Sequence, residues 1–173
     1  MQLIRNFTAV FAVSLSLAAA ASGATVAQPT NEPVTSKSPE RFKHYTLQGI
    51  PVAFRGKTNP LPINVGNVIK GADLYNARCA SCHGPMGFGN GAAGGALRPR
   101  PADLAWSLSD PRVKDDFLLW TITEGGAQFG SNMPAFKGDL SENRIWEIVT
   151  YMRAAFEGRE ASGPDRTGKL AAR

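Results

Sequence analysis

The chain of 173 residues is predicted to be all-α, and three observations support this fold class. The residues before Cys79, NVIKGADLYNAR, place apolar side chains at helical spacing from about Val68 to Tyr75. The stretch SENRIWEIVTYMRAAF does the same and has Ser141 or Asp139 as a possible cap. Between these two helices, glycine and proline are frequent, which is typical of loops. A further helix is expected over about 115–124, because Gly125 would stop it.

The N-terminal stretch 1–27 has the pattern of a secretory signal peptide. Arg5 precedes the apolar run FTAVFAVSLSLAAAA, and small residues follow, so cleavage is expected after Ala24 or Ala27. The uncharged run 7–27 is also long enough for an uncleaved membrane anchor. Its serine, threonine, glycine and alanine content favours cleavage. The sequence therefore predicts export to the periplasm, and it does not predict a lipid-anchored protein, because no cysteine lies near the cleavage zone.

Residues 28–66 hold six prolines, a density that disfavours regular helix and predicts an extended N-terminal arm. Apolar residues recur in this arm, so the part from about Arg41 to Leu61 is expected to lie against the rest of the protein, while 28–39 is expected to be mobile. These apolar residues are Phe42, Tyr45, Leu47, Ile50, Val52 and Phe54. Residues 67–157 form the expected globular domain. Residues 158–173 are predicted to be a disordered tail.

The net charge of +5 is unevenly distributed along the chain. Residues 67–157 contain nine Lys and Arg against ten Asp and Glu, so the basic excess belongs to the arm and the tail. Nucleic-acid binding is therefore not predicted, since a basic tail alone is weak support. Gly89, Gly91 and Gly94 match a dinucleotide-binding pattern, but no strand precedes them, and they are interpreted as loop glycines.

The stretch YNARCASCHGPMG contains both cysteines of the chain, Cys79 and Cys82, and His83 directly after them. A structural zinc site would need four ligands, and only His44 could be added as a third. A thioredoxin-like pair would follow a strand rather than a helix. A plain disulfide is a further alternative. The pattern Cys-x-x-Cys-His is the signature of covalently attached haem c, and this interpretation uses all three residues.

The spacing of the three residues suits that chemistry. One helical turn puts Cys79 and Cys82 on the same side, so their sulfurs can form thioethers with the two haem vinyl groups. His83 then lies under the iron and supplies the proximal nitrogen. One haem is predicted, because the chain contains one such motif.

Four motifs in this order, GADLYNARCASCHG, LRPRPADL, NMPAF and LSENRIWEIVTYMR, resemble a class I monohaem cytochrome c of the cbb3-subunit-like type. The resemblance covers about residues 67–157. It implies a cytochrome c fold, in which the first and last helices cross and the haem is held in a crevice. Gly71 and Tyr75 match the crossing positions of the family, facing Trp146 and either Tyr151 or Met152.

Met133 is the expected distal ligand of the iron. It stands 50 residues after His83, and its Met-Pro-x-Phe setting is similar to the ligand loop of the family. Met86 is too close to His83 in the sequence to reach the opposite face of the haem, and Met152 belongs to a helical core stripe. A loop hydrophobe is the plain alternative for Met133. His44 is a weaker candidate for the distal ligand, because it lies in the proline-rich arm and no ligand motif surrounds it.

The resemblance also implies residues that support the haem. In the family a proline carbonyl accepts a hydrogen bond from the second ring nitrogen of the proximal histidine. Pro101 is therefore the expected acceptor, and Pro99 is its alternative. Arg98, Arg100 and Trp106 are candidates for contacts with the haem propionates, where an arginine contact would be charge-assisted. A solvated loop is the alternative for these three residues.

Two functions are compatible with the sequence. The first is a non-enzymatic periplasmic carrier or subunit that transfers single electrons from a dehydrogenase or membrane complex to an oxidase or reductase. The second is a haem enzyme or gas sensor with an open iron, which would need a vacant distal position. Met133 in the ligand loop favours the first.

Overall fold

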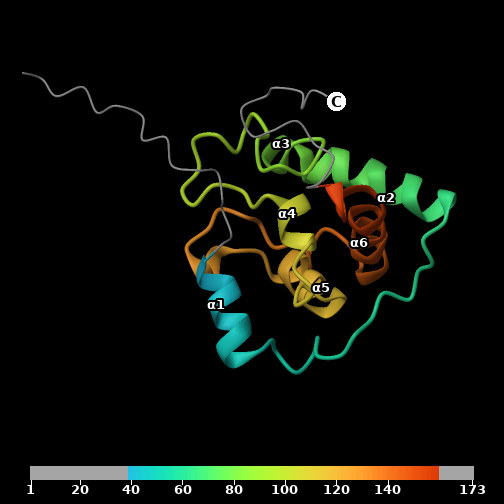
Figure 1. The fold of residues 1–173 in the computed structure, drawn as a ribbon. Helices are drawn as coiled ribbons and strands as arrows, with labels where there is room; N and C mark the ends of the chain where they lie inside the picture. Colours follow the sequence, from blue (N-terminus) through green and yellow to red (C-terminus); the bar gives the residue numbers. More distant parts are fainter. Residues whose placement is uncertain (1–38, 160–173) are drawn as a thin grey trace, which may run out of the picture. The chain divides into compact units, whose positions relative to one another are not determined.

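The computed structural model describes residues 39–159. Residues 1–38 and 160–173, which include the predicted signal peptide and most of the predicted tail, lie outside the described residues. The described part is helical and contains no strand, which confirms the predicted all-α class (Figure 1). Its elements are α1 (Pro39–Gln48), α2 (Val65–Arg78), α3 (Ala80–His83), α4 (Leu104–Leu108), α5 (Asp115–Glu124), the short 3-10 helix η1 (Ala127–Phe129) and α6 (Glu142–Phe156).

Helices α2 and α6 cross at Gly71 (Figure 1). A side chain at this position would collide with the backbone carbonyl oxygen of Glu147 and with Cβ of Tyr151. Next to the crossing, the ring of Tyr75 packs 5.3 Å from Tyr151 and 5.1 Å from Phe156, measured between centroids. Gly71 and Tyr75 are thus the crossing residues, as expected, and Tyr151 is the partner that they share.

The helix ends follow local capping chemistry. The side chain of Asn64 accepts a hydrogen bond from the backbone N–H of Asn67, so α2 begins at Val65, three residues before the expected start. Ser141 caps α6 in the same way through the N–H of Arg144. Helix α5 has the predicted bounds and ends before Gly125, whose φ of 65° favours glycine.

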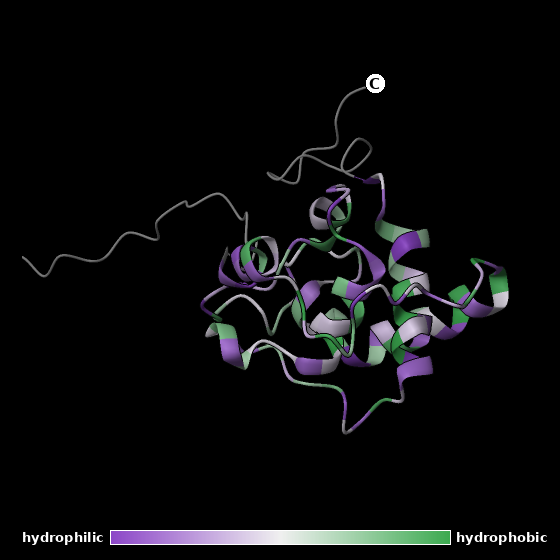
Figure 2. Cartoon of the chain, turned by 90° about the horizontal axis from the view of Figure 1, so that it is seen from below, coloured by the Kyte–Doolittle hydropathy of each residue, from purple (hydrophilic) through white to green (hydrophobic). Residues whose placement is uncertain are grey.

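The core lies between α5 and α6. Five of the ten residues of α5 are buried, on more than one side of the helix, whereas α2 buries only Gly71 and Tyr75. In Figure 2 the helix ribbons carry both hydrophobic (green) and hydrophilic (purple) stretches, as expected for helices with one face on a core. The largest fully buried side chains are those of Tyr75, Leu119, Trp120, Ile145, Ile148, Val149, Thr150 and Phe156.

The prediction of an extended N-terminal arm is wrong for part of it, because residues Pro39–Gln48 form a helix. Helix α1 begins at Pro39, where proline is tolerated because the first N–H groups of a helix have no intrahelical partner. The residues that follow, ERFKHYTLQ, contain no proline, so the average proline density of the arm concealed a stretch able to form a helix. Phe42 and Tyr45 on this helix pack against Phe117 of α5.

The expectation that the segment from about Arg41 to Leu61 lies against the domain is confirmed. Ile50 is 4% exposed and belongs to the core, and the side chains of Phe54 and Leu61 pack against this core. The amide of Asn59 donates hydrogen bonds to the hydroxyl of Thr150 (2.8 Å) and the carbonyl of Trp146 (3.3 Å), both on α6. In the part of the chain that the structure describes, no helix is both long enough and apolar enough to cross a membrane.

Candidate functional site

Cys79, Cys82 and His83 are held at the junction of α2 and α3. The backbone N–H groups of Cys82 and His83 both donate to the carbonyl of Cys79, at 3.1 and 2.9 Å, so the motif forms a single helical turn. Both thiols are free. Burial, and to a lesser degree the neighbouring Cys82, raises the pKa of the Cys79 thiol to about 12. Such a thiol is protonated at neutral pH, unlike the low-pKa thiol of a redox-active pair, which argues against a thioredoxin-like site.

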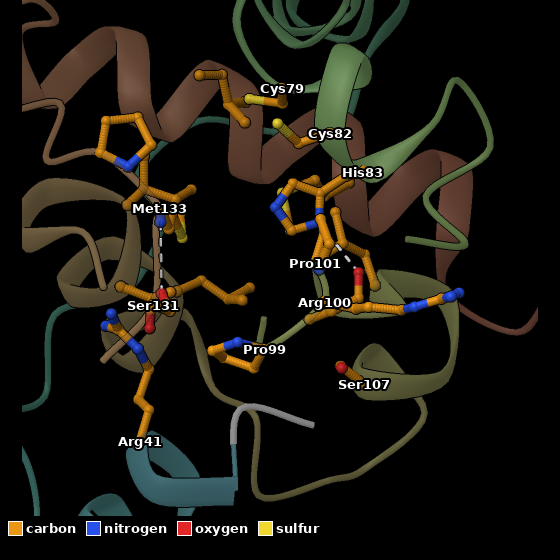
Figure 3. Close-up of a pocket in the computed structure, with 18 of the residues that line it drawn as sticks. Arg41, Cys79, Cys82, His83, Pro99, Arg100, Pro101, Ser107, Ser131 and Met133 are labelled. Atoms are coloured by element: carbon orange, nitrogen blue, oxygen red, sulfur yellow. Dashed lines mark hydrogen bonds between the residues drawn. The ribbon is translucent and has the colours of Figure 1, made fainter. Parts of the chain in front are cut away.

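The motif faces a cavity of about 330 Å³ that also contains Met133. Figure 3 shows Cys79, Cys82 and His83 on one side of this cavity and Met133 on the opposite side. Its size lies within the range of small-molecule and cofactor sites. The walls are mainly apolar and include Leu97, Leu104, Val113, Phe117, Leu118, Ile122, Phe136, Ile148 and Met152.

The imidazole of His83 is oriented by a backbone carbonyl. Its Nδ1 lies 3.0 Å from the carbonyl oxygen of Ala102, and because a carbonyl can only accept, Nδ1 carries the proton and Nε2 keeps its lone pair. The expected acceptor was the carbonyl of Pro101 or Pro99, and this prediction is wrong. The Pro101 carbonyl instead lies against Gly89, where any side chain would collide with it. Burial lowers the pKa of His83, and the hydrogen bond to Ala102 opposes this in part. The net lowering of the pKa favours the neutral form of the imidazole, which is the form that binds a metal.

The glycine-rich loop after the motif packs closely against it. The N–H groups of Gly89 and Gly91 donate to the carbonyls of His83 (2.8 Å) and Cys82 (3.1 Å). A side chain on Gly91 would collide with the carbonyl oxygen of Ser81. The glycines that match the dinucleotide pattern therefore serve loop packing against the motif helix, in agreement with their interpretation as loop glycines.

The Met133 loop is anchored to the end of α5. The N–H of Gly126 donates to the carbonyl of Met133 at 2.8 Å, and the N–H of Met133 donates to the hydroxyl of Ser131 at 3.4 Å (Figure 3). Further along, the N–H of Phe136 donates to the carbonyl of Ile122. These contacts fix the backbone at Met133 itself and at Phe136, and Met133 belongs to the cavity lining.

Of the three candidates for propionate contacts, two line the cavity and one does not. Arg100 and Trp106 belong to the cavity lining. Arg98 does not: its Nη1 donates to the carbonyls of Gly95 and Leu97, within its own loop. For Arg98, the structure thus supports the solvated-loop interpretation.

His44, the remaining histidine, is not part of the cavity lining. Its ring packs against those of Trp120 (5.9 Å) and Phe129 (5.4 Å between centroids). Among the described residues there is no group of three or more His, Cys, Asp and Glu side chains that could hold a metal ion. The zinc interpretation, which relied on His44 as a third ligand, finds no support.

Among the lining residues that were missed as site residues are Arg41, Phe42 and Thr121. Arg41 and Phe42 come from α1, in the part of the arm that was expected to pack on the domain. Arg41 is 4% exposed, and burial lowers its pKa to about 10, so it stays protonated at neutral pH. No motif marks Arg41. The only sequence signal is an arginine next to Phe42 in an otherwise amphipathic stretch.

The residues present fit haem c. Two thiols one helical turn apart can form thioethers, a half-buried imidazole with a lowered pKa can ligate iron, and the cavity walls are mainly apolar. The two buried side-chain atoms without a hydrogen-bond partner among the described residues, Nη1 of Arg41 and Oγ1 of Thr121, both belong to residues that line this cavity. They indicate an occupant that also carries polar groups.

Comparisons with known proteins agree with this site. Residues 66–152 match the family described as cytochrome c oxidase, cbb3-type, subunit III. The chain is 31% identical over 100 residues to thiosulfate dehydrogenase of Stutzerimonas stutzeri (strain A1501), covering 55% of this chain and 29% of that protein. It is 34% identical over 95 residues to the cytochrome bc1 complex cytochrome c subunit of Mycobacterium bovis, covering 54% and 29%.

These matches are partial, because the chain spans less than a third of the length of both relatives. Among solved structures, the Kuenenia stuttgartiensis reducing HAO-like protein complex Kustc0457/Kustc0458 is similar over 57% of this chain and 47% of that one, with a TM-score of 0.46 and 21% identity. The family match includes the haem motif, the Met133 loop and most of α6. The chain therefore belongs to the cbb3-type cytochrome c oxidase subunit III family, and the matched region is a cytochrome c domain, an electron-transfer module that implies haem c.

Proposed function

We propose that the chain is a periplasmic electron-transfer cytochrome that carries one covalent haem c with His83 and Met133 as axial ligands. The observation that carries this proposal is the arrangement of the cavity, which has an oriented imidazole on one side and a thioether on the other (Figure 3). When bound, haem c supplies one-electron chemistry at its iron.

Each residue of the site has a role in this proposal. Cys79 and Cys82 hold the group covalently, and the Ala102 carbonyl keeps the His83 ring in one orientation and raises its basicity. The neutral thioether of Met133 favours the reduced state and so raises the reduction potential. If His83 and Met133 both hold the iron, the haem would have no open position for a substrate. This is why we propose a carrier or an electron-transfer subunit and not an enzyme.

Export and partners are part of the same proposal. We place a signal peptide at 1–27, an N-terminal arm at 28–66, the haem domain at 67–157 and a tail at 158–173. Haem c in bacteria is attached outside the cytoplasm, which agrees with export. The relatives are named as a thiosulfate dehydrogenase and as subunits of a bc1 complex. Their names support redox proteins as partners: a dehydrogenase or membrane complex as donor and an oxidase or reductase as acceptor.

The decisive experiment replaces Met133 by alanine and uses Met86→Ala as the matched control, because Met86 is 44% exposed and does not line the cavity. The intact mass and acid-acetone extraction first establish that each protein carries one covalent haem. The unaltered protein is expected to be low-spin, with a Met-to-iron charge-transfer band, and to bind carbon monoxide slowly or not at all. Met133→Ala should lose the band, bind carbon monoxide and have a lower reduction potential, whereas Met86→Ala should behave as the unaltered protein.

Two results would contradict the proposal in different ways. If the unaltered protein is high-spin and binds carbon monoxide at once, the iron has an open position, and the haem enzyme or gas sensor becomes the better function. If the charge-transfer band survives in Met133→Ala, the carrier function stands and another residue is the distal ligand.

A further inference from the structure

Arg41 is a buried cation that the cytochrome c family match does not account for. It comes from α1 (Pro39–Gln48), outside the matched residues 66–152, and is 4% exposed. One of its guanidinium nitrogens, Nη2, donates to the carbonyl oxygen of Gly125. Its guanidinium carbon also lies 5.1 Å from the ring centroid of Trp120 and 4.8 Å from that of Phe129.

These contacts do not neutralise the charge of Arg41. Among residues 39–159, no Asp or Glu forms an ion pair with it, and its second terminal nitrogen, Nη1, is buried without a hydrogen-bond partner. A buried charge that lacks a partner of opposite sign is strongly destabilising, because its lost hydration is not replaced. An arginine in this position therefore calls for an anionic group that the described protein atoms do not supply.

The location of Arg41 indicates which anionic group this is. Arg41 lines the same cavity as the haem-binding motif, and so does Thr121, whose hydroxyl is the other buried polar atom without a partner among the described residues. Figure 3 shows Arg41 entering from the end of the cavity that lies opposite Cys79 and Cys82. In a haem, the two vinyl groups that join cysteines lie on one edge of the porphyrin, and the two carboxylates of the propionates lie on the opposite edge.

We infer that Arg41 binds a haem propionate, with Nη1 donating a charge-assisted hydrogen bond to its carboxylate. This inference rests on the proposed function, because it takes haem c as the occupant of the cavity. Gly125 and the rings of Trp120 and Phe129 hold the guanidinium in place for this contact. The N-terminal segment is then part of the haem site: α1 contributes a propionate ligand from outside the family region.

The test compares three variants of the full chain, isolated with haem attached. Arg41→Gln removes the proposed contact. Lys43→Gln is the matched control, because it removes one positive charge from an exposed position of the same helix. Arg41→Lys keeps the charge but changes the hydrogen-bonding geometry. The measurements are resonance Raman spectroscopy, in which the bending vibrations of haem propionates shift with their hydrogen bonds, and the reduction potential.

We expect Arg41→Gln to shift a propionate band and to lower the reduction potential more than Lys43→Gln does, because a cation next to the haem favours the reduced iron. Arg41→Lys should shift the band but keep more of the potential. If Arg41→Gln does not mature, Arg41→Lys decides alone, and an unchanged propionate band would overturn the inference. If Arg41→Gln and Lys43→Gln give the same spectra and potentials, Arg41 has only a packing role.

The failure of the proposed function gives a different result. In that case the unaltered protein carries no covalent haem, or its haem is high-spin, and this is seen in the absorption spectrum before any variant is compared. A normal haem spectrum with no effect of Arg41 rejects the inference alone.

Discussion

The N-terminal segment 39–64 and the family region 66–152 contribute to the same site in different ways. The family region supplies the haem-binding motif, the Met133 loop and the crossing of α2 and α6, and in α5 alone it buries five residues. In the segment, the described residues 40–64 include only two that are buried, Arg41 and Ile50. The segment is therefore attached through a few side chains, while the family region is held by a continuous core.

This difference predicts three sizes of effect on the free energy of unfolding. A substitution at the crossing of α2 and α6 should lower it most, and a substitution at a buried residue of the segment should lower it moderately. Breaking the surface ion pair of the segment should change it least.

The largest effect is expected for Gly71→Ala, at the crossing of α2 and α6. The added methyl group would overlap the carbonyl oxygen of Glu147, and because this is a backbone atom, the two helices would have to move apart. We expect the free energy of unfolding to fall by about 4 kcal/mol or more, measured by denaturant unfolding.

Gly66→Ala is the control for Gly71, since it lies in the same helix and its methyl group would meet only Oδ1 of Asn64, at 3.5 Å. It should be neutral or stabilise the protein by up to about 1 kcal/mol, because alanine favours helix. Equal effects of the two substitutions would show that the helices do not depend on close approach at Gly71.

An intermediate effect is expected for Ile50→Ala. Ile50 is 4% exposed, and its truncation should cost about 2–3 kcal/mol through lost apolar burial and the cavity that remains. Val52→Ala, at a position that is 77% exposed, should cost less than about 0.5 kcal/mol. If limited proteolysis after Lys43 and Arg55 is as rapid in the unaltered protein as in Ile50→Ala, the segment is not anchored there.

The smallest effect is expected for Lys57→Met. Nζ of Lys57 lies 2.7 Å from Oε2 of Glu142 and links the segment to α6, but the side chains are 39% and 52% exposed, so water and salt screen the pair. The loss in the free energy of unfolding should be about 0.5 kcal/mol and should vanish at high salt. Lys137→Met, which breaks the ion pair of an exposed lysine with the partly exposed Glu124 inside the family region, is the control. A loss for Lys57→Met as large as that for Ile50→Ala, without a similar loss in the control, would mean that charge holds the segment.

Local patterns predicted much of the family region. The bounds of α5, Asp115–Glu124, and the helix over Glu142–Phe156 follow from apolar spacing, caps and Gly125, which act within a few residues of one another. The membership of Cys79, Cys82, His83 and Met133 in one cavity followed from their motifs. Their roles as ligands remain a prediction.

The missed helix α1 has an identifiable cause. Proline density was averaged over 28–66, whereas the helix forms in a proline-free stretch whose Phe42 and Tyr45 pack on Phe117. Because this stabilising contact joins segments that lie far apart in the sequence, it leaves no local pattern.

The sequence by itself determined the helical class, the order of the helices of the family region and the single helical turn of the Cys-x-x-Cys-His motif, because these depend on residue type and on spacing within one or two turns. The tertiary structure alone decided that the carbonyl of Ala102, and not that of Pro101, accepts the hydrogen bond from His83. It also decided that Arg98 stays in its own loop and that Arg41 reaches the cavity. Carbonyl directions and the reach of long side chains depend on how distant segments pack, and that packing is fixed only when the whole core is assembled.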